Sequence, residues 1–152
     1  MSEQKNGIIK TYNERDETKL RSEYFIFNGK IEGDYKQYYS NGQLDIICNY
    51  KNGKIEGDYK QYYSNGQLYE ICNYNNNKKD GKCKIYEYFG NLWQEFNYKD
   101  DKREGEYKDY FDNGQLFRIC SYKDDKLSGK YKQFNENGQL YCEYNYEDGK
   151  RK

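Results

Sequence analysis

Aromatic and apolar residues recur along this chain in short arms separated by polar turns, and the whole pattern repeats every 24 residues. Two sets of five glycines show the spacing, the second following the first by nine residues: Gly33, Gly57, Gly81, Gly105 and Gly129, then Gly42, Gly66, Gly90, Gly114 and Gly138. A fixed short period indicates one supersecondary unit stacked on copies of itself. Contacts then run between neighbouring repeats, so we expect no closed active-site pocket and look for function on a surface.

A less regular copy precedes the five that the glycines mark. Leu20 and Tyr24 fall where the next repeat has Leu44 and Cys48, but Gly7 stands two residues early. We therefore expect a disordered N-terminal tail at residues 1–6 and a single repeat domain at 7–152. Its repeats, about six in number, are 7–32, 33–56, 57–80, 81–104, 105–128 and 129–152.

Each repeat contains two turn signals that divide it into two strand-length arms. The first is Asn-Gly, as in Asn41-Gly42, which is the strongest short-range signal for a β-hairpin. The second is Lys51-Asn52-Gly53-Lys54 and its relatives, with Asp100-Asp101 and Asp124-Asp125 in two repeats. The arms are rich in Tyr, Phe, Ile and Cys and are too short for helices. The predicted fold is all-β: an elongated repeat array of antiparallel β-hairpins that form one twisted, meandering sheet of about 12 strands.

The register of the hairpins decides which side chains share a face, and two registers are open. A two-residue Asn-Gly turn pairs Tyr39 with Leu44, and it places Tyr35 opposite Cys48. A three-residue Ser-Asn-Gly turn with a bulge pairs Tyr38 with Leu44 and moves Tyr35 to the other face. We favour the three-residue form, because it gathers the least variable positions into one core stripe: Tyr38, Leu44, Cys48 and Tyr50; Tyr62, Leu68, Cys72 and Tyr74; Tyr86, Leu92, Phe96 and Tyr98; Tyr110, Leu116, Cys120 and Tyr122; Phe134, Leu140, Tyr144 and Tyr146.

Composition limits the kind of interior that this protein can have. Only 34% of the residues are hydrophobic, but 21 Tyr, seven Phe and one Trp supply aromatic surface that suits a thin sheet. The formal net charge is zero, from 26 basic and 26 acidic residues, so no overall field attracts nucleic acid. The chain has no signal-peptide pattern and no apolar run of membrane-spanning length, so we expect a cytoplasmic protein.

Catalytic chemistry has no visible basis in the sequence. Histidine is absent, which removes the commonest general base and the commonest zinc ligand. The sequence contains no Cys-x-x-Cys, phosphate-binding loop, nucleophile elbow or calcium loop. Three cysteines share one repeat position with a Phe and a Tyr, as expected of an apolar structural site: Cys48, Cys72, Cys120, Phe96 and Tyr144. We therefore expect no enzyme, no cofactor and no metal.

Two rows of lysines run across the predicted sheet. One consists of Lys36, Lys60, Lys84, Lys108 and Lys132; the other, near the second turn, provides the candidate lipid-headgroup residues Lys54, Lys78, Lys102 and Lys126. Rows of cations can bind anionic phospholipid headgroups. Acidic neighbours such as Asp34, Glu56 and Asp80 favour the plainer interpretation, in which the rows provide cross-strand charge pairs and solubility.

The aromatic residues that follow the repeat leucines vary in kind, as residues on an exposed binding surface would. They form the candidate protein-contact set: Tyr69, Trp93, Phe117 and Tyr141. Tyr and Trp are favoured at recognition surfaces because they offer a large contact area at a low cost in conformational entropy. Aromatic pairs across strands also stabilise thin sheets, so a structural role for these residues stays open.

The recurring motif resembles a known repeat. Gly-x-Tyr-Lys-x-Tyr-x-x-Asn-Gly-Gln-Leu, followed by Tyr-x-Asn-Gly-Lys, is similar to the MORN repeat from Gly7 to Lys152, in the variant of YwqK-family antitoxin-like proteins and giant-virus repeat proteins. The fourth repeat departs from this motif at Phe89-Gly90-Asn91. The resemblance implies a chain of β-hairpins used for protein association and, in some members, for attachment to phospholipid membranes.

The sequence thus favours a non-catalytic scaffold that binds another protein, or a second copy of itself, through an aromatic-rich sheet surface. Two alternatives stay open. One is a peripheral adaptor that binds anionic phospholipid membranes through the lysine rows, and the other is a small-ligand or glycan-binding aromatic repeat module.

Overall fold

The computed structural model describes residues 6–152, and every regular element in them is a β-strand. The chain divides into two compact units between Lys78 and Lys79. The first unit holds β1 (Gly7–Asn13), β2 (Asp16–Phe27), β3 (Lys30–Tyr38), β4 (Leu44–Lys51), β5 (Lys54–Tyr62) and β6 (Leu68–Asn75). The second unit, from the start of β7, holds β7 (Lys78–Tyr86), β8 (Leu92–Lys99), β9 (Lys102–Tyr110), β10 (Leu116–Lys123), β11 (Lys126–Leu127), β12 (Gly129–Phe134), β13 (Leu140–Glu147) and β14 (Lys150–Arg151).

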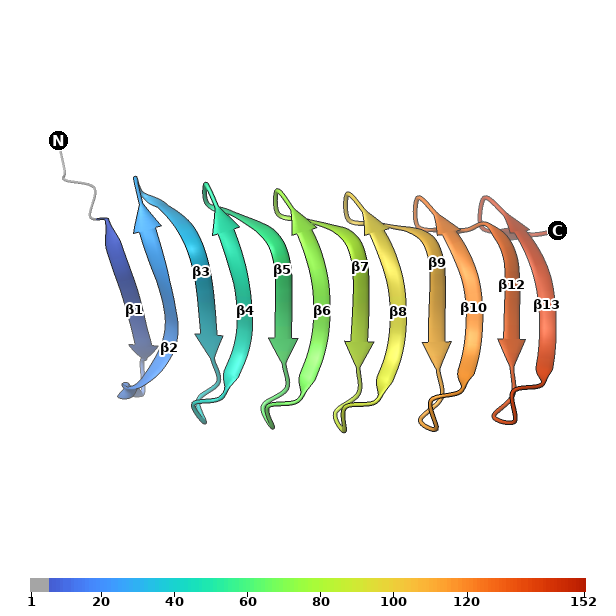
Figure 1. The fold of residues 1–152 in the computed structure, drawn as a ribbon, viewed down its shortest axis with the longest axis horizontal. Coiled ribbons are helices and arrows are strands. Elements are labelled where there is room, and N and C mark those ends of the chain that lie inside the picture. The colour runs from blue at the N-terminus through green and yellow to red at the C-terminus, as the bar shows by residue number, and fades with distance from the viewer. Residues whose placement is uncertain (1–5) are drawn as a thin grey trace. The chain divides into compact units, whose positions relative to one another are not determined.

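Strands that follow one another along the chain lie side by side and pair antiparallel within each unit (Figure 1). The prediction of an all-β array of antiparallel hairpins is confirmed. The described part of the chain has fourteen strands rather than about twelve. Two features account for the difference. The strand expected over 126–134 is interrupted at Ser128 and gives β11 and β12, both of which pair with β10, and the chain ends in the short β14. The predicted N-terminal tail lies outside the described residues except for Asn6, which accepts a hydrogen bond from the Asn28 N–H.

The two-residue turns have backbone angles of the type that matches strand twist in a hairpin. Asn52 and Gly53 both have positive φ, 54° and 77°, and the turns of the other repeats follow the same pattern. The second turn residue also donates its N–H to the backbone of the preceding repeat, 2.9 Å from Gly53 to the Ile31 carbonyl. Where Asn77 stands in place of glycine, its side chain accepts a hydrogen bond from the Ile55 N–H at 2.6 Å. Asn or Asp at this position therefore ties neighbouring repeats together.

The Ser-Asn-Gly turns are the three-residue form that the sequence favoured. The Tyr39 N–H donates to the Gln43 carbonyl at 2.8 Å, and the Gly42 N–H donates to the Tyr39 carbonyl at 2.9 Å. Gly42 has a φ of 86°, in the left-handed region that closes a three-residue hairpin loop. As expected, Tyr38 pairs with Leu44.

A second bulge, at Asp45, divides the residues of the predicted core stripe between the two faces of the sheet. Beyond this bulge Gln37 pairs with Ile46 and Tyr35 with Cys48, so both register features that we had treated as alternatives occur in one hairpin. Because side chains alternate along a strand, Tyr38 and Leu44 lie on the opposite face from Cys48. The prediction that all four stripe positions share a face is therefore wrong.

The two faces of each unit differ in character. One, the ring face, carries Tyr35, Cys48, Tyr50 and their counterparts, and it includes the most buried apolar side chains: Cys48, Cys72, Cys83, Phe96, Tyr107 and Cys120. Rings on this face contact one another within each unit, at centroid distances of 5.7 Å for Tyr24–Tyr35 and 5.5 Å for Phe96–Tyr107. The other, the lysine face, carries the row that begins with Lys36, together with Tyr38, Leu44 and their counterparts.

Gly57 marks the place where the ring face bends. Cys48 pairs with Tyr59 and Tyr50 with Ile55, so three residues of β5 face one residue of β4 at this point. The φ of Gly57 is 80°, while a Cβ added there would meet no atom within 4 Å. Glycine is therefore required by the backbone conformation rather than by space. The bend lets the aromatic rings of a single sheet cover one another.

Candidate functional site

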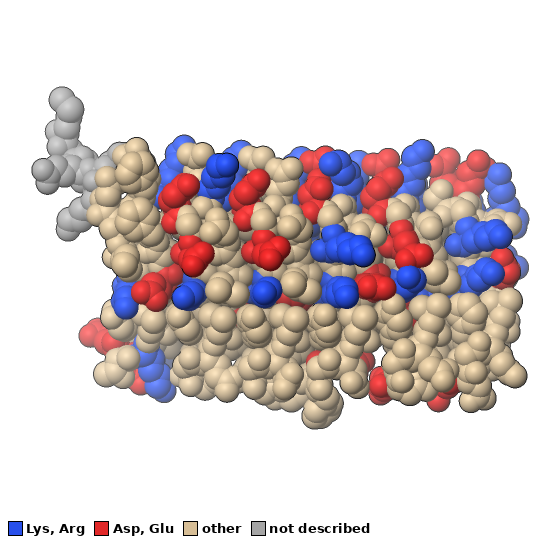
Figure 2. Space-filling view, in the orientation of Figure 1, with Lys and Arg blue, Asp and Glu red and all other residues tan. Residues whose placement is uncertain are grey.

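The lysine face has two zones of different chemistry. Figure 2 shows Lys, Arg, Asp and Glu gathered over the half of each unit nearer the two-residue turns, while the half nearer the three-residue turns is mostly neutral. The neutral half contains a Tyr and Leu strip that is half-buried except for Leu140, which is 51% exposed. The strip consists of Tyr38, Leu44, Tyr62 and Leu68 in the first unit and of Tyr86, Leu92, Tyr110, Leu116, Phe134 and Leu140 in the second.

The strip and its turns contain no cation in any of the five regular repeats. We call these segments the turn-end surface: 38–45, 62–69, 86–93, 110–117 and 134–141. Lys and Arg are absent from all of them, whereas Asp45, Glu87, Asp112 and Glu136 are present. The aromatic residues and the lysine rows are thus segregated along the strands, so the two candidate binding surfaces of the sequence occupy different zones.

The four predicted contact aromatics lie in the turn-end segments, each directly after a strip leucine and therefore on the opposite face of the sheet from the strip, and they differ in exposure. Tyr69 is half-buried against Tyr63, with ring centroids 5.0 Å apart, and Phe117 packs on Phe111 at the same distance. Trp93 is 44% exposed and Tyr141 is 74% exposed. The hairpins therefore use two of the four rings for their own packing and leave two available to a partner.

Sequence reasoning missed two further exposed rings in the turn of the fourth repeat. Phe89 is 85% exposed and Tyr88 is 47% exposed, and the two rings meet edge to face with centroids 5.6 Å apart. The signal was the Phe at a position where the other four regular repeats have Asn. We had treated this difference only as a departure from the motif.

The predicted lipid-headgroup lysines stand where strands leave the two-residue turns, and all four are exposed. In the first unit, Lys54 donates to the Asn76 side chain at 3.4 Å and stands opposite Lys51. In the second unit the turn residues are acidic, and Lys102 forms an ion pair with Asp124 at 3.0 Å. Charge at these turns is thus partly neutralised in the second unit. In the first unit the turn residues are uncharged, and the Glu32 and Glu56 carboxylates accept hydrogen bonds from the N–H groups of Asn52 and Asn76.

The other lysine row is paired with acidic residues of the same and neighbouring strands in the second unit. The Lys108 Nζ lies 2.5 Å from Glu106 and 3.8 Å from Glu95, and Lys132 lies 3.6 Å from Glu143. Such exposed pairs contribute little to stability but keep the face hydrated and electrically balanced. This part of the lysine face fits the interpretation in which the lysine rows provide charge pairs and solubility.

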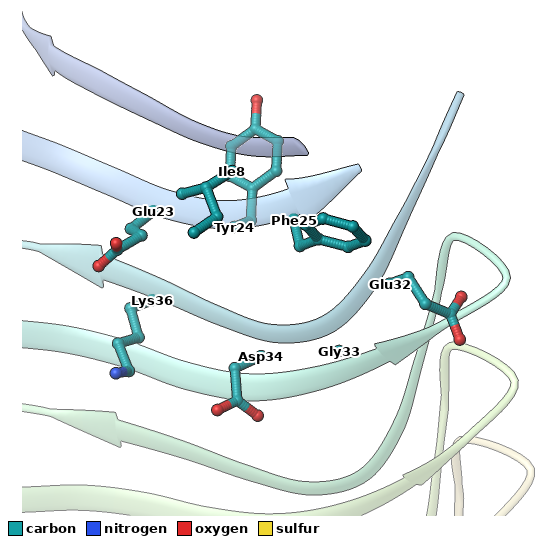
Figure 3. Close-up of a pocket in the computed structure, with 8 residues that line it drawn as sticks. All are labelled: Ile8, Glu23, Tyr24, Phe25, Glu32, Gly33, Asp34 and Lys36. Carbon is teal, nitrogen blue, oxygen red and sulfur yellow. The ribbon is translucent and has the colours of Figure 1, made fainter. Parts of the chain in front are cut away.

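A surface hollow of about 400 Å³ lies on the first unit, over β1, β2 and β3. Figure 3 shows Glu23, Asp34 and Lys36 extending beside the apolar side chains of Ile8 and Phe25. These carboxylates have local partners: Glu23 pairs with Lys10 at 3.2 Å, and Asp34 accepts a hydrogen bond from Asn49. The hollow therefore offers apolar surface beside carboxylates that have local partners.

The buried thiols are poorly suited to nucleophilic chemistry. Burial raises the pKa of Cys48 and of Cys120 to about 11. At neutral pH both side chains are protonated, and the thiolate, not the thiol, is the reactive species. This agrees with an apolar structural role for the repeat position that they occupy.

None of the described residues forms a helix long and apolar enough to cross a membrane.

Comparison with known protein families identifies the repeat. A family model described as the MORN repeat variant matches residues 31–52, 55–76, 79–100, 103–124 and 127–148. Each match covers a hairpin with its three-residue turn and ends in the first residue of the next two-residue turn, as 31–52 does with β3 and β4. A search of curated proteins found no match to this chain.

Proposed function

Because the chain belongs to the MORN repeat family, whose repeats often take part in membrane or protein interactions, we propose that it is a non-catalytic scaffold that binds another protein through its turn-end surface. The observation that carries the proposal is the composition of that surface. It presents half-buried Tyr and Leu residues with exposed Trp93 and Tyr141, and it contains no Lys or Arg. Tyr and Trp are enriched and Lys is depleted at protein interfaces.

The geometry supports this use because the rings are held by a rigid framework. Each three-residue turn is closed by two backbone hydrogen bonds, such as those between Tyr39 and Gln43 and between Gly42 and Tyr39. Turns of successive repeats also contact each other, since the Tyr39 hydroxyl donates to the Tyr62 carbonyl at 2.7 Å. A surface that is already ordered loses little conformational entropy when it binds.

Site-specific photocrosslinking in the source cells tests the proposal. A benzoylphenylalanine placed at Leu140 or Tyr141 should yield a discrete crosslinked protein, whereas the same residue at the exposed Lys150, beyond the turn-end surface, should not. Mass spectrometry identifies the captured protein, and a Leu140→Asp variant of the purified chain should weaken its binding. Equal crosslinking from all three positions, or none from the first two, would reject the turn-end surface as the interface.

A second candidate function, membrane attachment, has one observation in its favour. In the first unit, Lys30, Lys51 and Lys54 flank turns whose two residues are uncharged. The Glu32 carboxylate accepts a hydrogen bond from the Asn52 N–H at 2.7 Å, and the lysines outnumber it at this end, so anionic headgroups could bind them. Flotation with phosphatidylcholine vesicles, with and without phosphatidylserine, tests the idea. Binding that requires phosphatidylserine, declines with salt and is lost in Lys51→Glu/Lys54→Glu but not in Lys99→Glu/Lys102→Glu would support it. Absence of binding to anionic vesicles would end it.

A further inference from the structure

The turn of the fourth repeat displays an aromatic cluster that the other turns lack. We propose that Phe89, with Tyr88 and Trp93, forms a contact site for a basic, apolar segment of another protein. This inference rests on the scaffold function proposed above and names one contact point and the chemistry of its partner.

The backbone of this turn does not require an aromatic residue. The Glu87 N–H donates to the Asn91 carbonyl at 2.8 Å, and the Gly90 N–H donates to the Glu87 carbonyl at 2.8 Å. The corresponding bonds in the neighbouring turn, from Phe111 to Gln115 and from Gly114 to Phe111, are also 2.8 Å long. Phe89 thus sits on a turn whose backbone hydrogen bonds are the same as those of an Asn-containing turn.

Phe at this position gives up hydrogen bonds that Asn makes in other repeats. The Asn113 Oδ1 accepts from the Gln115 N–H at 2.9 Å, and its Nδ2 donates to the Glu136 carbonyl of the next turn at 3.4 Å. Asn41 makes the same two kinds of contact in the first unit. A phenyl ring makes neither. Asn91 supplies the bond to the next turn, to the Asp112 carbonyl at 3.3 Å, and the Phe89 ring adds no hydrogen bond that would explain the substitution.

The ring of Phe89 gains no burial in exchange. It is 85% exposed, and its edge-to-face partner Tyr88 is itself 47% exposed. Trp93, which leaves the same turn on β8, is 44% exposed. Two large exposed aromatic side chains in the turn and a third at the start of β8 form the kind of apolar anchor that dominates the binding energy of protein interfaces.

The surroundings of the cluster indicate a basic partner. Glu87 belongs to the same turn, and the Asn91 side chain donates to the backbone carbonyl of Asp112 at 3.3 Å, which places the next acidic turn alongside. No Lys or Arg occurs in 86–93, 110–117 or 134–141. Lys and Arg side chains are attracted both to carboxylates and to the faces of aromatic rings. An anionic membrane or the acidic turn end of a second copy would instead meet like charge.

A pair of synthetic peptides tests the proposal. Both are 18-residue amphipathic peptides with a Leu face and without Trp or Tyr, one with Arg and one with Glu on the polar face, labelled with fluorescein. We expect the Arg peptide to bind the full chain, measured by anisotropy, and to shift the emission of Trp93, the single Trp, to shorter wavelength. The Glu peptide should bind at least about tenfold more weakly.

Two matched Phe→Asn variants distinguish binding at the Phe89 site from non-specific binding to exposed apolar side chains. Phe89→Asn restores the residue that stands in four other turns, so it should keep the fold, checked by circular dichroism, and weaken binding of the Arg peptide at least about tenfold. Phe27→Asn removes a 51% exposed Phe outside the turn-end surface and should change binding less than about twofold.

Each contrary result overturns a defined part of the inference. No binding of the Arg peptide, or equal binding to wild type and Phe89→Asn, rejects the site, whereas the photocrosslinking result at Leu140 and Tyr141 still decides the scaffold function separately. Equal binding of both peptides rejects the basic partner. A Phe89-dependent shift of Trp93 emission with phosphatidylcholine vesicles, or Phe89-dependent dimers in light scattering, would reassign the cluster to a membrane or to self-association.

Discussion

The Asp109 carboxylate on β9 forms an ion pair with the Arg118 guanidinium directly opposite on β10, although Asp109 is only 3% exposed. The carboxylate also accepts a hydrogen bond from the Gln94 side chain at 3.0 Å, and the guanidinium lies over the Tyr107 ring, 5.2 Å from its centroid. In the second repeat of the chain, the equivalent pair is Gln37 opposite Ile46. Neither of these two residues is charged, and Gln37 donates a hydrogen bond to the buried Asp45 carboxylate at 2.8 Å. The ring face thus accepts either a neutral pair or two complementary charges.

Breaking this ion pair should be costly, whereas removing it completely should not. We expect Asp109→Asn to lower the free energy of unfolding by about 3 kcal/mol, because it leaves a partly buried Arg118 charge without its counterion. The double variant Asp109→Gln/Arg118→Ile, which copies Gln37 and Ile46, should fall within about 1 kcal/mol of wild type. Urea denaturation followed by circular dichroism measures both. A double variant as unstable as the single one would contradict this account.

Substitution of Gly57 should reveal a backbone requirement rather than a steric one. A Cβ at Gly57 meets nothing, but its φ is 80°, so Gly57→Ala should cost about 1–2 kcal/mol. Gly57→Asn should cost less, because all nine described non-glycine residues with positive φ are Asn or Asp. Asp58→Ala, at the adjacent exposed position, serves as the control and should change stability by less than about 0.5 kcal/mol. Equal losses for Ala and Asn at position 57 would point to packing instead.

The buried thiols should resist alkylation in the folded protein. Cys48 and Cys120 are 4% and 1% exposed, and burial raises the pKa of each to about 11. At pH 8 only about one thiol in a thousand is ionised, whereas Cys142 is half-buried and accessible. A short pulse of N-ethylmaleimide followed by peptide mapping should label Cys142 first. Cys48 and Cys120 should react after addition of denaturant, and labelling of Cys48 as fast as Cys142 would disprove the burial.

Stability should decline under alkaline conditions. Burial raises the pKa of Cys48 and Cys120 from 9 to about 11, and burial together with a hydrogen bond to Glu95 raises the pKa of Tyr110 to about 12. The unfolded chain then loses protons at a lower pH than the folded one. The stabilisation is complete below pH 9, falls between pH 9 and 11 for the thiols, and falls above pH 10 for the tyrosine. Urea midpoints measured from pH 8 to 11 should therefore decrease, and constant midpoints would refute the prediction.

Much of the fold could be predicted because its signals are local. The 24-residue period, the Asn-Gly turns and the arm lengths predict hairpins without knowledge of any distant contact. The register was only half predictable, because no residue type marks the second bulge. The bulge recurs in all five regular hairpins, although its extra residue is Asp45 in one and Tyr69, Trp93, Phe117 or Tyr141 in the others, and no turn rule contains that information.

The candidate site was predictable in type but not in detail. The sequence indicated an aromatic surface, yet whether Tyr69 packs on Tyr63 or points into solvent depends on the local bend of each hairpin. Phe89 was visible as a departure from the repeat, but its meaning required the hydrogen bonds of the Asn-containing turns for comparison. Repeat proteins allow this comparison within one chain, since each copy is a natural variant of the others.

The hydrogen bond from each two-residue turn to the preceding repeat gives the array a direction. The Gly53 N–H needs the Ile31 carbonyl, and the Gly149 N–H needs the Leu127 carbonyl, so the acceptor is always synthesised before its donor. A newly synthesised hairpin can therefore pair with the preceding, already folded repeat before the rest of the chain is synthesised. The order of these backbone bonds favours growth from the N-terminus, and trimming repeats from the C-terminus leaves every remaining two-residue turn with the backbone acceptor it had.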